Sequence, residues 1–408
     1  MGKRAGVKRA GLLLLGLLLL LPAVSARGAE EPSETEELTA RCALSCTGDD
    51  GGGIARLTDG KLSTACRMGP GDRLTVRADR DMGTLCLRFC QFDSAFFLLE
   101  RGETGLPVGM RFLRTGAVVL NLPLKPGCRW VELYPLGESF SVCEAAIYGV
   151  GPLPETVPDP GAPLEKADFL LVATHPDDEW VYLGGVYPLY GGQRSLRGTV
   201  VYVTLPNWER AQECIDGLWI GGMDTHPYFL GFKDVRKSAP AREKAAVRQE
   251  DVTLALVRLY RRIKPLVVVT QDPKKGEYGH WQHQLSARAA YDAAALAADG
   301  TYDPDSAAKY GTWTVQKVYQ HFAQGISQVE LEVETPLERY GGKTALEVAR
   351  LAYAAHRSQR KTKYMPGAAN KKKGDIVHFG LTWSQVGPDT GNDLFEHIPA
   401  EMLTGTQP

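Results

Sequence analysis

The stretch "LLVATHPDDEW", residues 170–180, begins as a buried strand and ends in charged residues. Its first residues are aliphatic or β-branched, which is typical of a strand that is covered on both faces. It then places His175, Pro176 and three consecutive carboxylates at one point of the chain. A second stretch, "GEYGHWQHQ" at residues 276–284, follows another aliphatic run. Charged stretches after two such strands predict a site at one edge of a sheet.

The segment from residue 166 to 408 alternates predicted strands and helices. The strands are expected at Phe169–Ala173, Gly198–Thr204 and Pro265–Thr270, and the longest helices at Ala241–Ile263 and Gln282–Ala298. This alternation predicts an α/β fold with a parallel sheet that is covered by helices on both faces.

Residues 38–150 have a different pattern, in which short apolar runs are broken by turn residues. The runs include "RLTVRA", "TLCLRFC", "SAFFLLE" and "RWVELYP". Short strands at this spacing predict an antiparallel, all-β sandwich. Residues 151–165 are rich in proline and predict a stiff linker between the two parts.

The first 29 residues have the composition of an export signal. Basic residues precede an apolar run, and small residues follow it: Lys3, Arg4, Lys8, Arg9, Leu12–Leu21, Ala23, Ser25 and Ala26. We expect cleavage after Ala26 or Ala29, a secreted or extracytoplasmic protein, and no membrane span afterwards. Cleavage after Ala26 removes four positive charges, so the net charge changes from −1 to −5. A net negative charge argues against a nucleic-acid partner.

Seven of the eight cysteines lie before residue 150, and Cys214 alone follows. In an exported protein this clustering favours one or more disulfides in the first part of the chain, although the sequence fixes no pairing. Because seven is odd, at least one of these thiols has no partner among the others. The Cys-x3-Cys spacings in this part are not those of a zinc ribbon or finger.

The two charged stretches contain the residue types of a hydrolytic zinc site. His175 and Asp178 are three residues apart, as are His280 and His283. Imidazole and carboxylate ligands suit zinc, and Asp177 beside them can accept a proton from water. Without the second stretch, the carboxylates after His175 are as well explained by the acidic first turn of a helix. Helix capping does not explain both stretches together.

Together, "ATHPDDE" and "GEYGHWQHQ" resemble the PIG-L/LmbE-like family of metal-dependent N-deacetylases, over about residues 165–400. The resemblance implies a Rossmann-like fold and hydrolysis of the acetamide of an N-acetylated amino sugar, of the GlcNAc or GalNAc type, to amine and acetate. By position, it implies one catalytic zinc ion held by His175, Asp178 and His283, with Asp177 as the general base.

The same resemblance assigns three further residues. His280, as a protonated imidazole, would stabilise the oxyanion and help to protonate the leaving amine. Tyr278 would approach the same oxyanion, and Arg210 in "NWERAQECIDGLWIGG" would bind the sugar. The chain departs from the family motif His-Pro-Asp-His, because it has Trp281 and Gln282 between the histidines. The acid that would support the histidines is therefore missing, and Asp272 or Glu277 is expected to replace it.

In the first part of the chain, "LTDGKLSTAC" (57–66) and "EAAIYGVG" (144–151) resemble the discoidin or galactose-binding-like sandwiches. The resemblance implies sugar binding and a structural Ca²⁺ ion, with Asp59 near that ion. A sandwich that only acts as a spacer is equally compatible with the pattern.

Several aromatic and histidine residues have two readings each. Trp208 and Trp281 could stack on a sugar or pack in the core. The other histidines are expected to be structural, with His356 the best placed to reach the site: His226, His321, His356, His378 and His397.

The favoured function is an exported zinc-dependent deacetylase that acts on an acetylated amino sugar or glycan. The alternatives are a non-catalytic glycan-binding protein and a metal-dependent amidase or esterase that acts on a non-sugar substrate.

Overall fold

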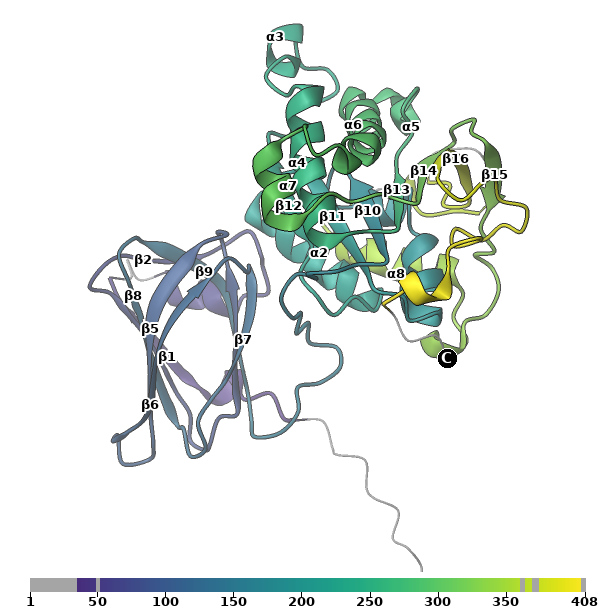
Figure 1. Ribbon diagram of the computed structural model, residues 1–408. Coiled ribbons are helices and arrows are strands. Elements are labelled where there is room, and N and C mark those ends of the chain that lie inside the picture. Colours follow the sequence, from purple (N-terminus) through teal and green to yellow (C-terminus); the bar gives the residue numbers. More distant parts are fainter. Residues whose placement is uncertain (1–34, 49–51, 360–363, 369–373, 405–408) are drawn as a thin grey trace, which may run out of the picture. The chain divides into compact units, whose positions relative to one another are not determined.

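The computed structural model describes residues 35–48, 52–359, 364–368 and 374–404 (Figure 1). The expected signal peptide, residues 1–29, lies outside the described residues. Within them, no helix combines the length and the apolar composition that crossing a membrane requires.

The part of the chain from Ala43 to Tyr148 forms two antiparallel sheets around one core. The five-stranded sheet has the order β1 (Ala43–Thr47), β3 (Arg73–Arg77), β8 (Trp130–Pro135), β5 (Ser94–Arg101) and β6 (Pro107–Thr115). The four-stranded sheet has the order β2 (Cys66–Met68), β9 (Phe140–Tyr148), β4 (Thr84–Phe89) and β7 (Val119–Pro123). Short 3-10 helices precede β1 and β2: η1 (Thr39–Arg41) and η2 (Ile54–Leu57).

The core of this sandwich confirms the predicted all-β class. Leu87, Phe96 and Val142 come from both sheets and are fully buried in one cluster. Strand β6 has no counterpart among the predicted strands. It lies at the edge of its sheet and exposes apolar side chains such as Phe112. Its sequence therefore lacks the alternation of buried apolar and exposed polar residues that marks an inner strand.

Five of the seven early cysteines take no part in the expected disulfides, because they are free thiols in the structure: Cys42, Cys86, Cys90, Cys128 and Cys143. Two of them show how such thiols serve as small apolar core residues. Burial raises the pKa of Cys86 to about 12 and that of Cys128 to about 11. At neutral pH both therefore stay protonated and poorly reactive.

The second part of the chain is built on a seven-stranded mixed sheet. Its order is β12 (Tyr228–Phe232), β11 (Gly198–Thr204), β10 (Phe169–Ala173), β13 (Val267–Thr270), β14 (Lys317–His321), β16 (His378–Ser384) and β15 (Ser327–Glu330). The first five strands are parallel, as predicted. The prediction is wrong for β16 and β15, which run antiparallel at one edge. Antiparallel edge strands are common additions to parallel sheets.

Alternate residues of β10 face two different cores, which explains its uninterrupted apolar sequence. Phe169 and Leu171 belong to one core cluster, whereas Leu170 and Val172 belong to the other. The first cluster is covered by α2 (Trp208–Ile220), α8 (Ala345–Ala355) and the π-helix η3 (Tyr187–Gln193). The second is covered by α4 (Gln249–Ile263) and α6 (Trp281–Ala298), which lie side by side (Figure 1).

Most predicted elements of this part are confirmed within a residue or two, and one helix is divided. Strand β13 begins at Val267 instead of Pro265, since proline cannot donate to a ladder. The helix expected at Ala241–Ile263 is broken into α3 (Ala241–Lys244) and α4, and the break lets Val247 enter the core. Other short helices within the described residues include α7 (Pro304–Tyr310), η4 (Glu338–Tyr340) and η6 (Ala400–Met402).

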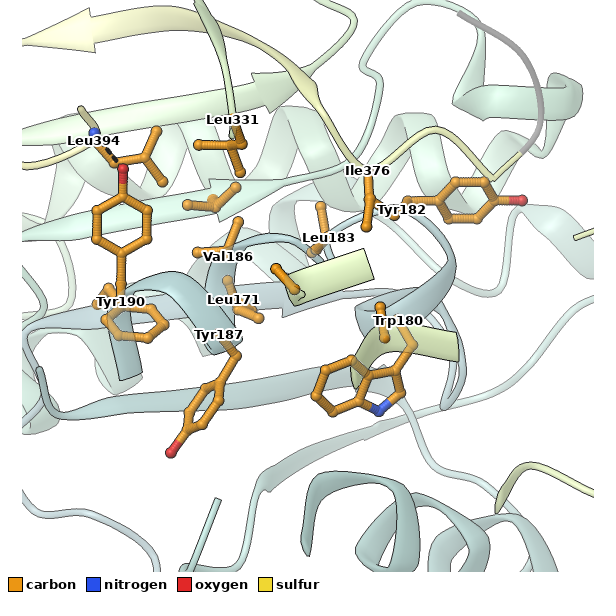
Figure 2. Close-up of a cluster of buried hydrophobic side chains, with 14 of the residues drawn as sticks. Leu171, Trp180, Tyr182, Leu183, Val186, Tyr187, Tyr190, Leu331, Ile376 and Leu394 are labelled. Atoms are coloured by element: carbon orange, nitrogen blue, oxygen red, sulfur yellow. Dashed lines mark hydrogen bonds between the residues drawn. The ribbon is translucent and has the colours of Figure 1, made fainter. Parts of the chain in front are cut away.

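The residues that follow β10 are anchored in the first core cluster (Figure 2). Helix α1 (Asp178–Val181) is buried throughout, and its Trp180 is 1% exposed. Gly221 makes room for this indole, because a Cβ at that position would lie 2.1 Å from the Trp180 ring. Removing a buried tryptophan side chain typically costs about 3–5 kcal/mol, so this packing fixes the start of α1 firmly.

Candidate active site

The first site segment lies directly after β10 and turns back on itself. The His175 backbone N–H donates to Asp178 Oδ2 at 2.7 Å, and His175 Nδ1 is 3.2 Å from the same oxygen. Both side chains are buried, at 7% and 4% exposure. The carboxylate and the imidazole therefore face one point, as their spacing predicts.

The second segment follows β13 and contains α5 (Gly276–Gly279) and the first turn of α6. His283 is fully buried on α6, and its Nε2 lies 3.2 Å from His175 Nδ1 and 3.4 Å from Asp178 Oδ2. The two segments, which are more than 90 residues apart in the sequence, thus meet at one site. This confirms that parallel strand ends bring them together.

Three potential ligand atoms form a nearly equilateral triangle with edges of 3.2, 3.2 and 3.4 Å: His175 Nδ1, Asp178 Oδ2 and His283 Nε2. Bonds of about 2.0–2.1 Å at tetrahedral angles separate neighbouring zinc ligands by about 3.3–3.4 Å. The donor set therefore fits one face of a tetrahedral metal site and leaves a position open.

His280 lies beside this triangle, and the ligating atoms of His175, His280 and His283 all lie within 4.8 Å of one another. By distance alone, all three histidines could hold a metal ion. The Nδ1 atom of His280, however, accepts the Gln282 backbone N–H at 3.3 Å. A neutral imidazole whose Nδ1 accepts carries its proton on Nε2, so His280 presents an N–H donor instead of a ligand lone pair.

The protonated imidazole expected for His280 stays a prediction, and the electrostatics of the surrounding protein groups favour the neutral form. Burial, followed by the positive charge of His175 and His283, lowers the pKa of His280 to about 3. The imidazole is therefore neutral at physiological pH. Its Nε2–H can still donate to an oxygen on which negative charge develops, so stabilisation of an oxyanion does not require a cationic ring.

Glu277 supplies the acid that the second motif lacks, which confirms one of the two expected substitutes. Its Oε2 is 2.6 Å from His283 Nδ1, so it accepts that N–H and leaves Nε2 free to bind a metal. Its Oε1 accepts the Asp272 backbone N–H at 2.7 Å and lies 3.1 Å from His321 Nδ1. The backbone of Glu277 has a φ of 55°, a strained conformation that places this carboxylate under His283.

We predict that Glu277→Gln weakens metal binding by about 10–100-fold, the usual effect of removing a carboxylate that orients a ligand histidine. A competition titration with a chromogenic chelator measures this change. Glu250→Gln, on the exposed side of α4, is the matched control and should leave the affinity unchanged. Wild-type affinity in Glu277→Gln would show that the carboxylate only packs the loop.

Asp177 lines the cavity next to the three potential ligand atoms. Its backbone has an unusual conformation, with a φ of 122°. Its N–H donates to Glu179 Oε2 at 2.8 Å, and its Oδ1 is 3.3 Å from an Arg210 nitrogen. Burial, and then the negative charge of Asp178, raises the pKa of Asp177 to about 7. A half-buried, strained carboxylate of this kind is suited to exchange a proton near neutral pH.

Arg210 connects the first segment to a loop that the sequence did not single out. Its guanidinium donates to the Pro176 carbonyl at 2.6 Å and pairs with Asp177 at 3.3 Å and Asp234 at 3.4 Å. Asp234 Oδ1 in turn lies 3.4 Å from His175 Nε2. Asp234 therefore orients His175 with its Nδ1 toward the triangle, much as Glu277 orients His283.

These groups surround a cavity of about 270 Å³, slightly smaller than the roughly 300–1,000 Å³ of typical ligand sites. All the predicted site residues except the deeper His283 line it: His175, Asp177, Asp178, Arg210, Tyr278 and His280. Seven lining residues were not predicted: Asp234, Arg236, Lys237, Tyr364, Val181, Tyr182 and Gln359. The sequence signal for the first three was the cluster of charge in "KDVRK" (233–237), directly after an apolar run.

Other candidates from the sequence lie elsewhere. Trp208 and Trp281 do not line the cavity, and Trp281 packs against the second core cluster. Tyr278 and Tyr364 form the aromatic side instead, with ring centroids 5.6 Å apart. His356 is buried outside the cavity, where its Nε2 lies 3.1 Å from Glu179.

A search of protein-family models finds no match to the chain. One curated relative is the 1D-myo-inositol 2-acetamido-2-deoxy-alpha-D-glucopyranoside deacetylase of Streptomyces scabiei, which is 32% identical. The match covers 41% of this chain and 60% of the relative, so the chain spans about 60% of the relative's length. A second such deacetylase, from Catenulispora acidiphila, is 30% identical over 41% of this chain and 58% of the relative. These relatives confirm the resemblance to the PIG-L/LmbE-like deacetylases.

Two solved structures are each similar to a portion of the chain. The N,N'-diacetylchitobiose deacetylase of Pyrococcus horikoshii is 18% identical, covers 48% of this chain and 73% of its own, and has a TM-score of 0.36. The lectin domain of Lectinolysin is 17% identical, covers 29% of this chain and 99% of its own, and has a TM-score of 0.26.

Proposed function

We propose that this chain is a zinc-dependent N-deacetylase that hydrolyses the acetamide of an N-acetylated amino sugar to the amine and acetate. The observation that carries the proposal is the triangle of His175 Nδ1, Asp178 Oδ2 and His283 Nε2, with the Asp177 carboxylate beside it in a cavity. The similarity to curated amino-sugar deacetylases supports the choice of substrate class.

The donor set suits zinc because it combines two imidazoles with one carboxylate in a small triangle. When bound, a zinc ion would lower the pKa of water and polarise the acetamide carbonyl. The protein supplies the remaining chemistry through groups that are already oriented.

Asp177 would accept the proton of the attacking water and later deliver it to the leaving amine. Its position is fixed by its own N–H bond to Glu179 and by the ion pair with Arg210. As the carbonyl carbon becomes tetrahedral, its oxygen gains negative charge. The Nε2–H of His280 is available to donate to that oxygen from a largely buried position.

Tyr278 can assist as a neutral donor. Burial, and then the negative charge of Asp178, raises the pKa of Tyr278 above its usual value, so the phenol keeps its proton. Its ring lies 5.7 Å from that of His280, between centroids. We assign Arg210, which lines the cavity, to sugar binding.

We expect acetate release from N-acetylglucosamine, N-acetylgalactosamine or one of their glycosides. A coupled acetate assay on such a panel, with zinc-loaded protein, measures this activity. N-acetylated amino acids and acetate esters form the second arm, because hydrolysis of these compounds alone would favour the amidase or esterase alternative. A metal-binding protein that releases no acetate from either arm would favour the glycan-binding alternative.

We also infer a Rossmann-like arrangement for the second part of the chain. The strand order supports it: numbered along the chain, the five parallel strands from β12 to β14 run third, second, first, fourth and fifth. This is the order of doubly wound sheets, whose ligands bind at the carboxyl ends of the strands.

For the sandwich, we propose a structural Ca²⁺ ion near Asp59. Thr64 Oγ1 lies 3.0 Å from Asp59 Oδ1, and the buried Glu144 Oε1 has no hydrogen-bond partner among the described residues. Burial and the negative charge of Asp59 raise the pKa of Glu144 to about 7, which a bound cation would reverse. Calcium should raise the melting temperature of the wild type but not that of Asp59→Asn.

We further propose that the protein is exported and that the sandwich holds the enzyme near a glycan. The support is the export-signal pattern of residues 1–29, which predicts a mature chain that lacks them. N-terminal sequencing of protein from the culture medium or periplasm tests this, and a full-length cytoplasmic chain would contradict it.

A further inference from the structure

The cavity has two positive charges on its rim that the catalytic chemistry does not use. Arg236 and Lys237 follow β12 in the chain, and both line the cavity. In the part of the chain that the structure describes, neither side chain forms an ion pair with a carboxylate. Arg210 differs from them, because it is matched by both Asp177 and Asp234.

Lys237 is held close to the catalytic segment. Its Nζ donates to the Tyr278 carbonyl at 2.7 Å and lies 5.6 Å from the centroid of the Tyr278 ring. Gly279, with a φ of +87°, makes this approach possible, because a Cβ there would lie 3.0 Å from Nζ. The ammonium group of Lys237 is thus held against Tyr278, two residues before His280.

The charges of the cavity do not balance once a divalent ion is present. Its three lining carboxylates are Asp177, Asp178 and Asp234. Arg210 and a dication together carry three positive charges and match them. Arg236 and Lys237 then remain as a net charge of about +2 at the entrance, where walls of low dielectric constant strengthen attraction to an anion.

Resting on the proposed deacetylase function, we propose that Arg236 and Lys237 form a subsite for an anionic substituent of the amino sugar. The substrate class is an N-acetylhexosamine that carries a phosphate or carboxylate near its acetamido group. The planar guanidinium suits two oxygens of such a group, and the ammonium adds a second, independently held charge.

The first measurement compares kcat/KM on a matched series of sugars with zinc-loaded wild-type protein. The series contains N-acetylglucosamine, its 1-phosphate, its 6-phosphate and its 3-O-lactyl ether, so the arms separate phosphate from carboxylate and one position from another. We expect at least one anionic sugar to exceed the neutral sugar by about 10-fold or more, as expected for charge-assisted contacts. Because both residues are exposed at the rim, the preference should weaken at high salt.

The second measurement uses the double variant Arg236→Gln/Lys237→Gln. The ratio of kcat/KM on the preferred anionic sugar to that on the neutral sugar should fall by about 10–100-fold, the loss expected for one or two charge-assisted contacts. Lys233→Gln/Arg242→Gln is the control, since it removes two cations nearby in the chain that do not line the cavity. The control should keep the wild-type ratio. An unchanged ratio in the cavity variant would overturn the proposal.

A binding assay separates this proposal from the proposed function. Calorimetry on zinc-loaded wild-type protein compares glucosamine 6-phosphate, glucosamine 1-phosphate, muramic acid and glucosamine, none of which has an acetamide to hydrolyse. Tighter binding of an acidic amine, lost in the cavity variant and kept in the control, supports the subsite even if no sugar is deacetylated. Equal binding of all four, or none, overturns the subsite. Hydrolysis of the neutral and anionic sugars at equal rates would support the deacetylase function but contradict the anion subsite.

Discussion

Replacing Asp177 by Asn lowers kcat by about 10²–10⁴-fold while the protein keeps its metal, the loss expected when a general base is removed. The amide is nearly isosteric with the carboxylate but cannot accept a proton from water. Two measurements check this: steady-state acetate release on the best sugar, and metal content by mass spectrometry. Activity and metal content must both be measured, because loss of the metal alone would also abolish activity.

The structure gives reasons to expect that Asp177→Asn stays folded and correctly placed. The strained φ of 122° is held by the backbone N–H bond to Glu179, and this bond does not involve the side chain that is changed. The side-chain oxygen retained in Asn can still accept from Arg210. Asp292→Asn on α6, whose carboxylate accepts from Gln249, is the control for a generic loss of an acid. Near-normal turnover in Asp177→Asn would mean that Asp177 only shapes the loop.

The strands that carry the site could be predicted closely from the sequence, for a physical reason. Strands β10 and β11 are buried on both faces, so each is an unbroken apolar run with clear ends. The edge strands gave no such signal. Strand β12 is a short apolar run that is only partly buried, and the antiparallel β15 has a single buried residue among its four, so neither has the unbroken buried pattern of an inner strand.

The ligands could also be predicted, whereas the groups around them could not. His175, Asp178 and His283 lie in compact motifs of which the chemistry is visible in the sequence. Asp234 reaches His175 from a loop after β12, and no spacing within the chain reveals that approach. The charge of His280 could not be predicted from the sequence, because the effect of burial and neighbouring imidazoles on its pKa depends on three-dimensional packing.

His283→Ala should lose most of its metal, whereas His280→Ala should keep it, and this contrast tests the division of labour between the two histidines. His283 Nε2 completes the triangle, while Glu277 accepts the proton of its Nδ1. We expect metal affinity in His283→Ala to fall by more than about 100-fold, beyond the 10–100-fold typical of a supporting partner. A chelator competition titration measures both variants under the same conditions.

His280→Ala should instead lower kcat by about 10²–10³-fold at full metal occupancy, the loss expected for one oxyanion donor. The reason is the bond from the Gln282 N–H to His280 Nδ1, which leaves the proton on Nε2 and no lone pair for a metal. His280→Gln, which retains a side-chain N–H donor, should recover part of the activity. If His280→Ala releases the metal, His280 is a ligand and the ring has the opposite tautomer. If His283→Ala retains the metal, the triangle is not the metal site, and the three-histidine cluster becomes the better assignment.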